Sequence, residues 1–312
     1  MAYQLSEINE RARRDPVDFL RDCDNTYDKK LHRAADMIRE HAAVSPLIFL
    51  SGPSGSGKTT TAMKIEEILD RSGMETHTVA LDNYFRSVRE EDYPRTPDGK
   101  LDLESPDCLD MELLADHFHA LEQGKAIEIP KYSFTEQRQE RHTGNFLNYR
   151  PGDLVIFEGI HALNDTFSAI APDAFRLYIS ARSVVEDGKE VVFKGTWMRL
   201  CRRVVRDHQF RGTVPTDTLK MWANVRRGEK KYISPYKEKA NLMFDSSLMC
   251  EVSVMKSFVS ELFRDIPLDI DRSVELHSIV PALERFEAID PALVPENSLL
   301  REFIGGSSYH YG

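Results

Sequence analysis

The chain has 312 residues, of which 41% are hydrophobic and 29% charged, proportions that fit one large α/β domain with extensions or two small domains. The formal net charge of −10 argues against a nucleic-acid partner, because non-specific binding of nucleic acid needs a basic face. No apolar run is long enough to cross a bilayer and the N-terminus lacks a signal-peptide pattern, so we expect a cytoplasmic protein with no membrane partner. The four cysteines form no C-x-x-C pair, which argues against a zinc site or a disulfide framework.

Residues 1–44 predict a helical extension. Asp15 and Pro16 are a favourable N-cap and first-turn pair for a helix that carries Val17, Phe19 and Leu20. Further apolar residues at helical spacing predict one face of another helix: Leu31, Ala34, Ala35 and Ile38.

A phosphate-binding pattern follows this extension. The apolar run 47–50 predicts a buried strand, and the helical spacing of Ala62, Ile65 and Leu69 predicts a helix after it. Between them the chain matches G-x-x-x-x-G-K-[ST], and this strand–loop–helix context is typical of a P-loop that binds a triphosphate. Lys58 is expected to reach the β- and γ-phosphates of ATP, and the Thr59 hydroxyl to ligate Mg²⁺. The residues expected to bind ATP in this loop are Gly52, Pro53, Ser54, Gly55, Ser56, Gly57, Lys58, Thr59 and Thr60.

The next elements alternate between strands and helices. Strands are expected at 76–81, 126–129, 153–157 and 175–179, and a helix at 111–121, with a loop rich in charge and proline at 86–106. This alternation predicts an α/β fold of the P-loop NTPase type, with a mostly parallel sheet and helices on both faces. Helical N- and C-terminal extensions complete the fold.

Two carboxylates follow strands of this sheet. Glu158 ends the apolar strand 153–157 in the Walker-B arrangement, so it is a candidate for holding Mg²⁺. Asp82 follows the strand 76–81 and is a candidate base for an attacking hydroxyl. Both are expected near the P-loop, because open α/β sheets bind ligands at the carboxyl ends of their strands.

At residues 47–262 the chain resembles the uridine kinase and phosphoribulokinase family of P-loop kinases. The resemblance rests on the order and spacing of several motifs, which are the P-loop, Leu81-Asp-Asn-Tyr-Phe85, Ser105-Pro-Asp107, Ile129-Pro-Lys-Tyr-Ser-Phe134, Phe157-Glu-Gly-Ile160 and Arg199-Leu-Cys-Arg-Arg-Val-Val-Arg-Asp207 with Arg211-Gly212. The segments 225–229 and 295–306 resemble a narrower group of bacterial nucleoside-kinase-like proteins. The expected organisation is an N-terminal extension at 1–44, a kinase domain at 45–265 with a lid around 195–215, and a C-terminal extension at 266–312.

The resemblance implies a role for each matching position. Asp82 would be the general base and would lie near the metal, with Thr59 and Glu158 completing the Mg²⁺ environment. Lys58 and Arg206 would assist catalysis, and Arg206 and Arg211 would belong to a lid that closes on the phosphates of ATP. The substrate site would be formed by Asp82, Tyr84, Glu104, Tyr132, Phe134, Gln137 and Arg203.

The implied activity is ATP-dependent phosphorylation of the 5′-hydroxyl of a nucleoside. Glu104 stands where uridine-cytidine kinases have an aspartate for the ribose, and Gln137 where they have a histidine at the base edge, so the base is open. Alternative acceptors are a sugar phosphate such as ribulose 5-phosphate, a polyol, glycerate or pantothenate. A nucleotide-dependent regulatory switch is the alternative of another class, although the chain has no N-K-x-D for guanine.

Two further segments complete these expectations. An insertion around 187–194 is expected to bring Lys189 and Lys194 near the lid. Residues 274–279 and 283–286 predict an amphipathic helix, and 305–308 a flexible end. The sequence leaves homo-oligomer formation open.

Overall fold

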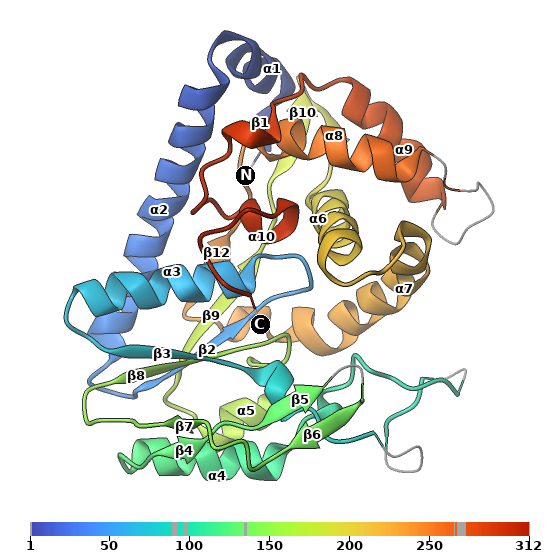
Figure 1. The fold of residues 1–312 in the computed structure, drawn as a ribbon. Helices are drawn as coiled ribbons and strands as arrows, with labels where there is room; N and C mark the ends of the chain where they lie inside the picture. The colour runs from blue at the N-terminus through green and yellow to red at the C-terminus, as the bar shows by residue number, and fades with distance from the viewer. Residues whose placement is uncertain are drawn as a thin grey trace.

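A five-stranded parallel sheet lies at the centre of the molecule in the computed structural model, which describes residues 2–88, 93–96, 99–133, 136–264, 266 and 273–311 (Figure 1). The strand order is β12-β9-β2-β8-β3, and every neighbouring pair is parallel. This confirms the α/β fold class expected from the sequence. The strands are β2 (Leu47–Ser51), β3 (Thr76–Ala80), β8 (Leu154–Glu158), β9 (Phe175–Ser180) and β12 (Leu242–Asp245).

Helices cover both faces of this sheet because side chains of each strand alternate between the two faces. In β2, Ile48 and Leu50 join one buried cluster, and Leu47 and Phe49 join the other. The cluster on the Leu47 face includes side chains of α4 (Met111–Glu122) and α5 (Asp165–Ile170). The larger cluster on the Ile48 face includes side chains of α1 (Leu5–Arg14), α2 (Pro16–His41), α3 (Lys58–Arg71), α6 (Gly195–Phe210), α7 (Pro215–Gly228), α8 (Glu251–Phe263), α9 (Ser273–Glu284) and α10 (Arg301–Ile304).

The N-terminal extension contains a long helix. The Asp15 side chain accepts a hydrogen bond from the backbone N–H of Asp18 at 2.9 Å and Pro16 occupies the first turn, as the sequence predicted. The two apolar groups expected on separate helices belong to one 26-residue helix, α2, and α1 precedes it. The helix continues between them because Cys23 and Tyr27 extend the buried stripe without a break.

Short strands lie outside the central sheet. The strand expected at 126–129 is present as β4 (Ile127–Glu128), but it pairs antiparallel with β7 (Phe146–Leu147). Next to it, β5 (Lys131–Ser133) and β6 (Arg138–Glu140) form a second antiparallel pair. These segments therefore extend beyond the carboxyl end of β3 without adding to the parallel sheet.

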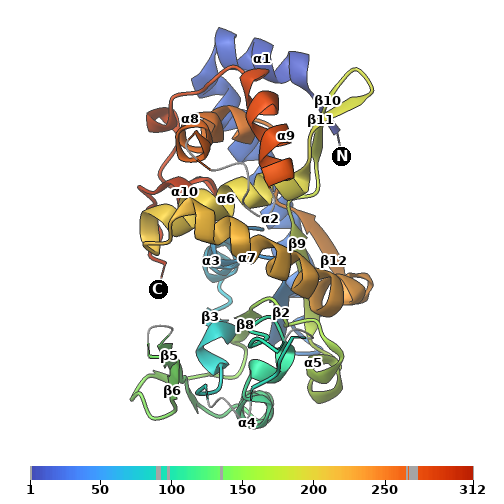
Figure 2. The same ribbon diagram turned by 90° about the vertical axis from the view of Figure 1, so that its right-hand side faces the viewer.

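The insertion around 187–194 forms a hairpin of β10 (Val184–Asp187) and β11 (Glu190–Phe193), which pairs with β1 (Ala2–Gln4). Arg285 binds Asp187 at 2.5 Å, and the hairpin contacts α1 and α9. Figure 2 shows it beside the N-terminus, at the end of the molecule opposite β5 and β6. The hairpin joins the two terminal extensions, so Lys189 in its turn is not near the lid as expected. Lys194 directly precedes α6, and its Nζ lies 5.0 Å from the centre of the Trp197 ring at the start of the expected lid.

The C-terminal segment returns to the P-loop helix. After α9, a 3-10 turn (Pro291–Leu293) and α10 lead the chain back between α3 and α6 (Figure 1). The expected flexible end is held in place, since Ser308 donates from its backbone N–H to the carbonyl of Glu296 at 2.9 Å. Within the described part of the chain, no helix has the length and apolar character needed to span a membrane.

Candidate active site

The P-loop connects β2 to α3 and its shape depends on glycine. Gly55 and Gly57 adopt φ of 73° and 79°, a region that favours glycine. A Cβ at Gly52 would lie 2.0 Å from the carbonyl oxygen of Ile179, and one at Gly55 would lie 2.8 Å from that of Arg199. The loop therefore fits closely against β9 and α6, and side chains at these positions would displace it.

Three successive carbonyls of the loop are held by donors outside it. Arg199 donates to the carbonyl oxygen of Ser54 at 3.2 Å, Arg202 to that of Gly55 at 3.1 Å, and the Ser246 hydroxyl to that of Ser56 at 2.6 Å. Because the N–H of each peptide unit points opposite to its carbonyl, the amides of Gly55 and Gly57 point away from these donors, and that of Ser56 bonds to the carbonyl oxygen of Pro53 at 3.2 Å. This is the arrangement that binds anions.

Lys58, Thr59 and Glu158 meet at the start of α3. The Thr59 hydroxyl donates to Glu158 Oε1 at 2.9 Å, and the buried Oε2 has no hydrogen-bond partner among the described residues. Burial raises the pKa of Glu158. The charge of Lys58 lowers this pKa, and the charge of the nearby Asp82 raises it further. An unpartnered buried carboxylate oxygen beside a hydroxyl and a second carboxylate fits Mg²⁺, which prefers oxygen ligands.

The donor set for such a cation is small. Within the described part of the chain, no three or more His, Cys, Asp or Glu side chains gather as a metal-binding group. This is compatible with Mg²⁺ in kinases, where one or two carboxylates act together with the phosphates of the nucleotide.

Asp82 lies in the 3-10 turn Leu81–Tyr84 that follows β3. Its side chain is exposed to solvent, and the protein around it raises its pKa, which the charges of Lys58, Arg211 and Arg206 oppose. Asp82 is therefore close enough to Lys58 and the two lid arginines for their charges to act on it. A carboxylate open to solvent beside these cations can accept a proton from an incoming hydroxyl.

The lid arginines share one buried carboxylate that sequence reasoning missed. Asp207 is 2% exposed and accepts from Arg206 at 3.0 and 2.8 Å. Its carboxylate also lies 3.2 Å from Arg203 Nε and 3.6 Å from Arg211 Nη1. Arg203 in turn donates to the Ser54 hydroxyl at 2.8 Å, so Asp207 connects the lid helix to the P-loop. The sequence does contain a signal for this contact, because Asp207 stands four residues from both Arg203 and Arg211 on the predicted helix.

The other arginines of α6 are structural. Arg199 is buried and binds both carboxylate oxygens of Glu229, and Arg202 is buried against Glu251. Both support the P-loop through its carbonyls and face away from its inner side. This explains why the helix carries more arginines than a lid needs.

Glu104 lies in a second polar group of the site. Burial raises its pKa to about 7, and the charges of Arg203, Arg227 and Lys58 lower it. Next to it, buried Asp102 accepts from Arg227 at 2.6 Å and from the Tyr232 hydroxyl at 3.0 Å. Gly228 packs here as well, because a Cβ at this position would lie 2.5 Å from Cβ of Glu104.

The remaining predicted substrate residues have different positions. Tyr84 was expected in the substrate site, but its side chain is fully buried and its hydroxyl lies 2.8 Å from His117 Nδ1. It therefore belongs to the core under α4. Tyr132 is half-buried and contacts Phe85 edge-on, with ring centroids 5.6 Å apart. Gln137 is exposed in the β5–β6 turn with φ of 51°. Phe134 lies outside the described residues.

His161 is a buried polar residue near the site that the sequence did not single out. It is 2% exposed, and neither ring nitrogen has a hydrogen-bond partner among the described residues. Burial lowers its pKa to about 4, with smaller effects of Asp102 and Lys58. It follows Glu158 by three residues, so its place after the strand was the available signal.

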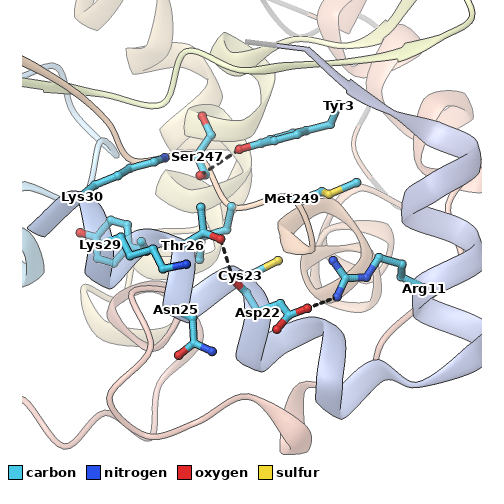
Figure 3. Close-up of a pocket in the computed structure, with 12 residues that line it drawn as sticks. Tyr3, Arg11, Asp22, Cys23, Asn25, Thr26, Lys29, Lys30, Ser247 and Met249 are labelled. Carbon is cyan, nitrogen blue, oxygen red and sulfur yellow. Dashed lines mark hydrogen bonds and ion pairs between the residues drawn. The ribbon is translucent and has the colours of Figure 1, made fainter.

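A cavity of about 390 Å³ lies elsewhere, between α2 and residues 247–249. Figure 3 shows Tyr3, Arg11, Lys29 and Lys30 around it, with Arg11 bound to Asp22 at 2.5 Å. None of the residues predicted for catalysis or binding lines this cavity.

Taken together, the P-loop at the carboxyl end of a parallel sheet and the strand-end acids define a P-loop nucleotide-binding phosphotransferase. Residues 47–253 match the phosphoribulokinase/uridine kinase family, and the chain belongs to that family. It is a kinase that transfers a phosphoryl group to a hydroxyl group.

Two curated relatives each match about two thirds of this chain. Uridine-cytidine kinase 2-B of Danio rerio is 28% identical over 224 residues, covering 69% of this chain and 79% of that protein. The uridine kinase of Deinococcus deserti is 28% identical over 206 residues, covering 66% and 89%. Among solved structures, a Silicibacter sp. protein described as a fructose transport system kinase is 18% identical, covers 69% of this chain and 98% of that chain, and has a TM-score of 0.49.

Proposed function

We propose that this protein uses Mg-ATP to phosphorylate the 5′-hydroxyl of a nucleoside. The observation that carries the proposal is the convergence of Lys58, the Thr59–Glu158 pair and Asp82 at the mouth of one P-loop. Relatives with 28% identity are named uridine kinase or uridine-cytidine kinase, which supports a nucleoside as the acceptor. A cytoplasmic location forms part of the proposal.

ATP would bind with its phosphates against the amides of the P-loop. Lys58 would reach the β- and γ-phosphates, and Arg206 and Arg211 would neutralise charge on the transferring group. Thr59, Glu158 and Asp82 would hold Mg²⁺, which supplies further neutralisation of the phosphate oxygens. Asp207 would keep the arginine side chains together in the geometry that clamps the phosphates.

Asp82 would accept the proton of the attacking hydroxyl. Its exposure leaves it within reach of an acceptor, and the surrounding protein raises its pKa toward the range in which a carboxylate takes up a proton. Glu104 and Arg203 would contact the acceptor beside it, and Tyr132 would offer a ring for a flat base.

The pairing of the basic residues favours an acceptor without a phosphate of its own. Arg199 and Arg226 bind Glu229, Arg202 binds Glu251, and Arg227 binds Asp102. The lid arginines share Asp207 and face the phosphates of ATP. Most of the arginine charge in residues 199–231 is therefore paired within the protein or directed to ATP, which argues for a nucleoside over a sugar phosphate.

A screen for ADP release tests the proposal. Purified protein is supplied with Mg-ATP and common ribo- and deoxynucleosides, ribulose 5-phosphate, pantothenate, glycerate and inositol. We expect one nucleoside to stimulate ADP release strongly, and a Lys58→Ala protein to show no stimulation. Stimulation by a non-nucleoside alone would overturn the acceptor, and ATP binding without stimulation by any alcohol would favour a regulatory switch.

A further inference from the structure

The C-terminal segment contacts the first turn of α3 through a buried carboxylate. Glu302 on α10 is 8% exposed, and its Oε2 accepts from the backbone N–H of Thr60 at 3.3 Å and from the Thr60 hydroxyl at 2.5 Å. The Tyr311 hydroxyl lies 3.1 Å from the same Thr60 hydroxyl and 3.1 Å from that of Ser307. Thr60 is thus held from two points of a segment about 240 residues later in the chain.

These contacts use one of the backbone amides at the start of α3. The first N–H groups of a helix have no partner within it. Here the amide of Thr61 bonds to the carbonyl of Gly57 at 3.1 Å, and the amide of Thr60 is taken by Glu302. The amides of Lys58 and Thr59 have no protein acceptor among the described residues. The carboxylate therefore takes the amide of Thr60 and leaves those of Lys58 and Thr59 for a phosphate.

The same segment packs against the P-loop at two more places. A Cβ at Gly57 would lie 2.6 Å from Cδ1 of Leu299, a fully buried side chain. The guanidinium of Arg202, which binds the carbonyl of Gly55, lies 5.0 Å from the centre of the Phe303 ring. The segment therefore contacts Gly57 and Thr60 directly and reaches Gly55 through Arg202.

The segment also reaches the end of the lid helix and the N-terminal extension. Gly305, with φ of 85°, lies so close to Phe210 that a Cβ there would be 3.1 Å from Cζ of that ring. Phe210 directly precedes Arg211 of the lid. On the other side, the Ser298 hydroxyl donates to Asp24 on α2 at 2.8 Å. The C-terminal segment therefore joins α2, the P-loop and the end of α6.

We propose that residues 295–311 form part of the nucleotide site, with Glu302 as the positioning residue that holds the first turn of α3 for the phosphates of Mg-ATP. The segment lies outside the residues that match the family, 47–253, so nothing in that match assigns it a role. The proposal depends on the proposed binding of ATP and not on the identity of the acceptor. Loss of Glu302 would let Thr59 and Thr60 rotate away from the geometry that the phosphates and Mg²⁺ need.

Direct binding of Mg-ATP to the full chain tests this role by titration calorimetry. We expect Glu302→Ala to weaken Mg-ATP binding about tenfold or more, and Glu302→Gln to stay within about threefold of the wild type, because an amide oxygen still accepts from Thr60. Once an acceptor is known, the KM for ATP should rise in Glu302→Ala while the KM for the acceptor is unchanged. Glu287→Gln is the matched control, since this exposed glutamate lies just before the segment, outside residues 295–311, and should bind as the wild type.

The outcome that overturns the proposal is a folded Glu302→Ala protein that binds Mg-ATP as tightly as the wild type. If Glu302→Ala lowers the melting temperature below the assay temperature, Tyr311→Phe decides, because it removes one hydroxyl of the same network. We expect it to weaken Mg-ATP binding about two- to fivefold, and unchanged binding would overturn the proposal. Because binding is measured without an acceptor, failure of the nucleoside assignment leaves this test intact.

Discussion

The ion pair between Arg202 and Glu251 allows a sharp test of how the P-loop is supported. The two side chains are 0% and 1% exposed, and the guanidinium also donates to the carbonyl oxygens of Gly55 and Ser246. Glu251→Ala would leave a buried cation without its counter-charge. Removing one partner of a buried pair costs about 3–5 kcal/mol, because the remaining charge has lost both water and its partner.

This cost is large compared with a total stability of about 5–15 kcal/mol. A loss of 1 kcal/mol lowers the melting temperature of a protein of roughly this size by about 2–3 °C, so we expect a fall of about 6–15 °C for Glu251→Ala. Thermal unfolding followed by circular dichroism measures it, with urea unfolding as a second reading. Glu251→Gln should fall less, because its amide oxygen still accepts one hydrogen bond.

The control for this prediction is a pair of the same chemistry at the surface. Arg11 and Asp22 lie 2.5 Å apart with side chains 22% and 50% exposed, so Asp22→Ala should cost less than about 1 kcal/mol. If Glu251→Ala melts within 2–3 °C of Asp22→Ala, the reasoning from burial is refuted.

Two pH-dependent effects follow from raised carboxylate pKa values. Burial raises the pKa of Asp24 to about 6 from an unfolded value near 3.8, so its protonated form favours folding and its contribution to stability is lost as pH rises from about 4 to 6. Asp24→Asn should therefore raise the free energy of unfolding by up to about 3 kcal/mol above pH 6, and with it the melting temperature, and should change neither much below pH 4. Equal effects at both pH values would refute this. For Glu104, with a pKa of about 7, we expect kcat/KM for the acceptor to rise with pH between 6 and 8, because the carboxylate is the form that accepts from a hydroxyl. In Glu104→Gln this rise should be absent, and an unchanged pH profile would remove Glu104 from the acceptor site.

Local sequence patterns predicted the parts of the fold that depend on local chemistry. The P-loop followed from its glycines and Lys58 between a strand and a helix, and Glu158 from its place after a buried strand. Both lie where expected, because a parallel sheet brings the carboxyl ends of β2 and β8 to one edge. By contrast, β12 at Leu242–Asp245 was missed, since four residues at a sheet edge carry almost no periodic signal.

The contacts missed from the sequence are those that join distant segments. Glu302 meets Thr60 across 242 residues, and no spacing rule connects them. Tyr84 was misplaced for a related reason: it follows Asp82 by two residues, and the 3-10 turn directs it to His117 in the core while Asp82 stays exposed. Neighbours in sequence therefore divided between core and site according to tertiary contacts.

In the proposed reaction, Asp82 activates the acceptor hydroxyl for transfer from ATP at this P-loop. Its most direct test compares kcat and Mg-ATP binding in wild-type and Asp82→Asn protein with the best acceptor from the screen. Loss of a positioned base lowers turnover by about 10²- to 10⁴-fold, and we expect this fall with a Kd for Mg-ATP within about threefold of the wild type. Turnover within tenfold of the wild type, with ATP still bound, would show that Asp82 is not the base.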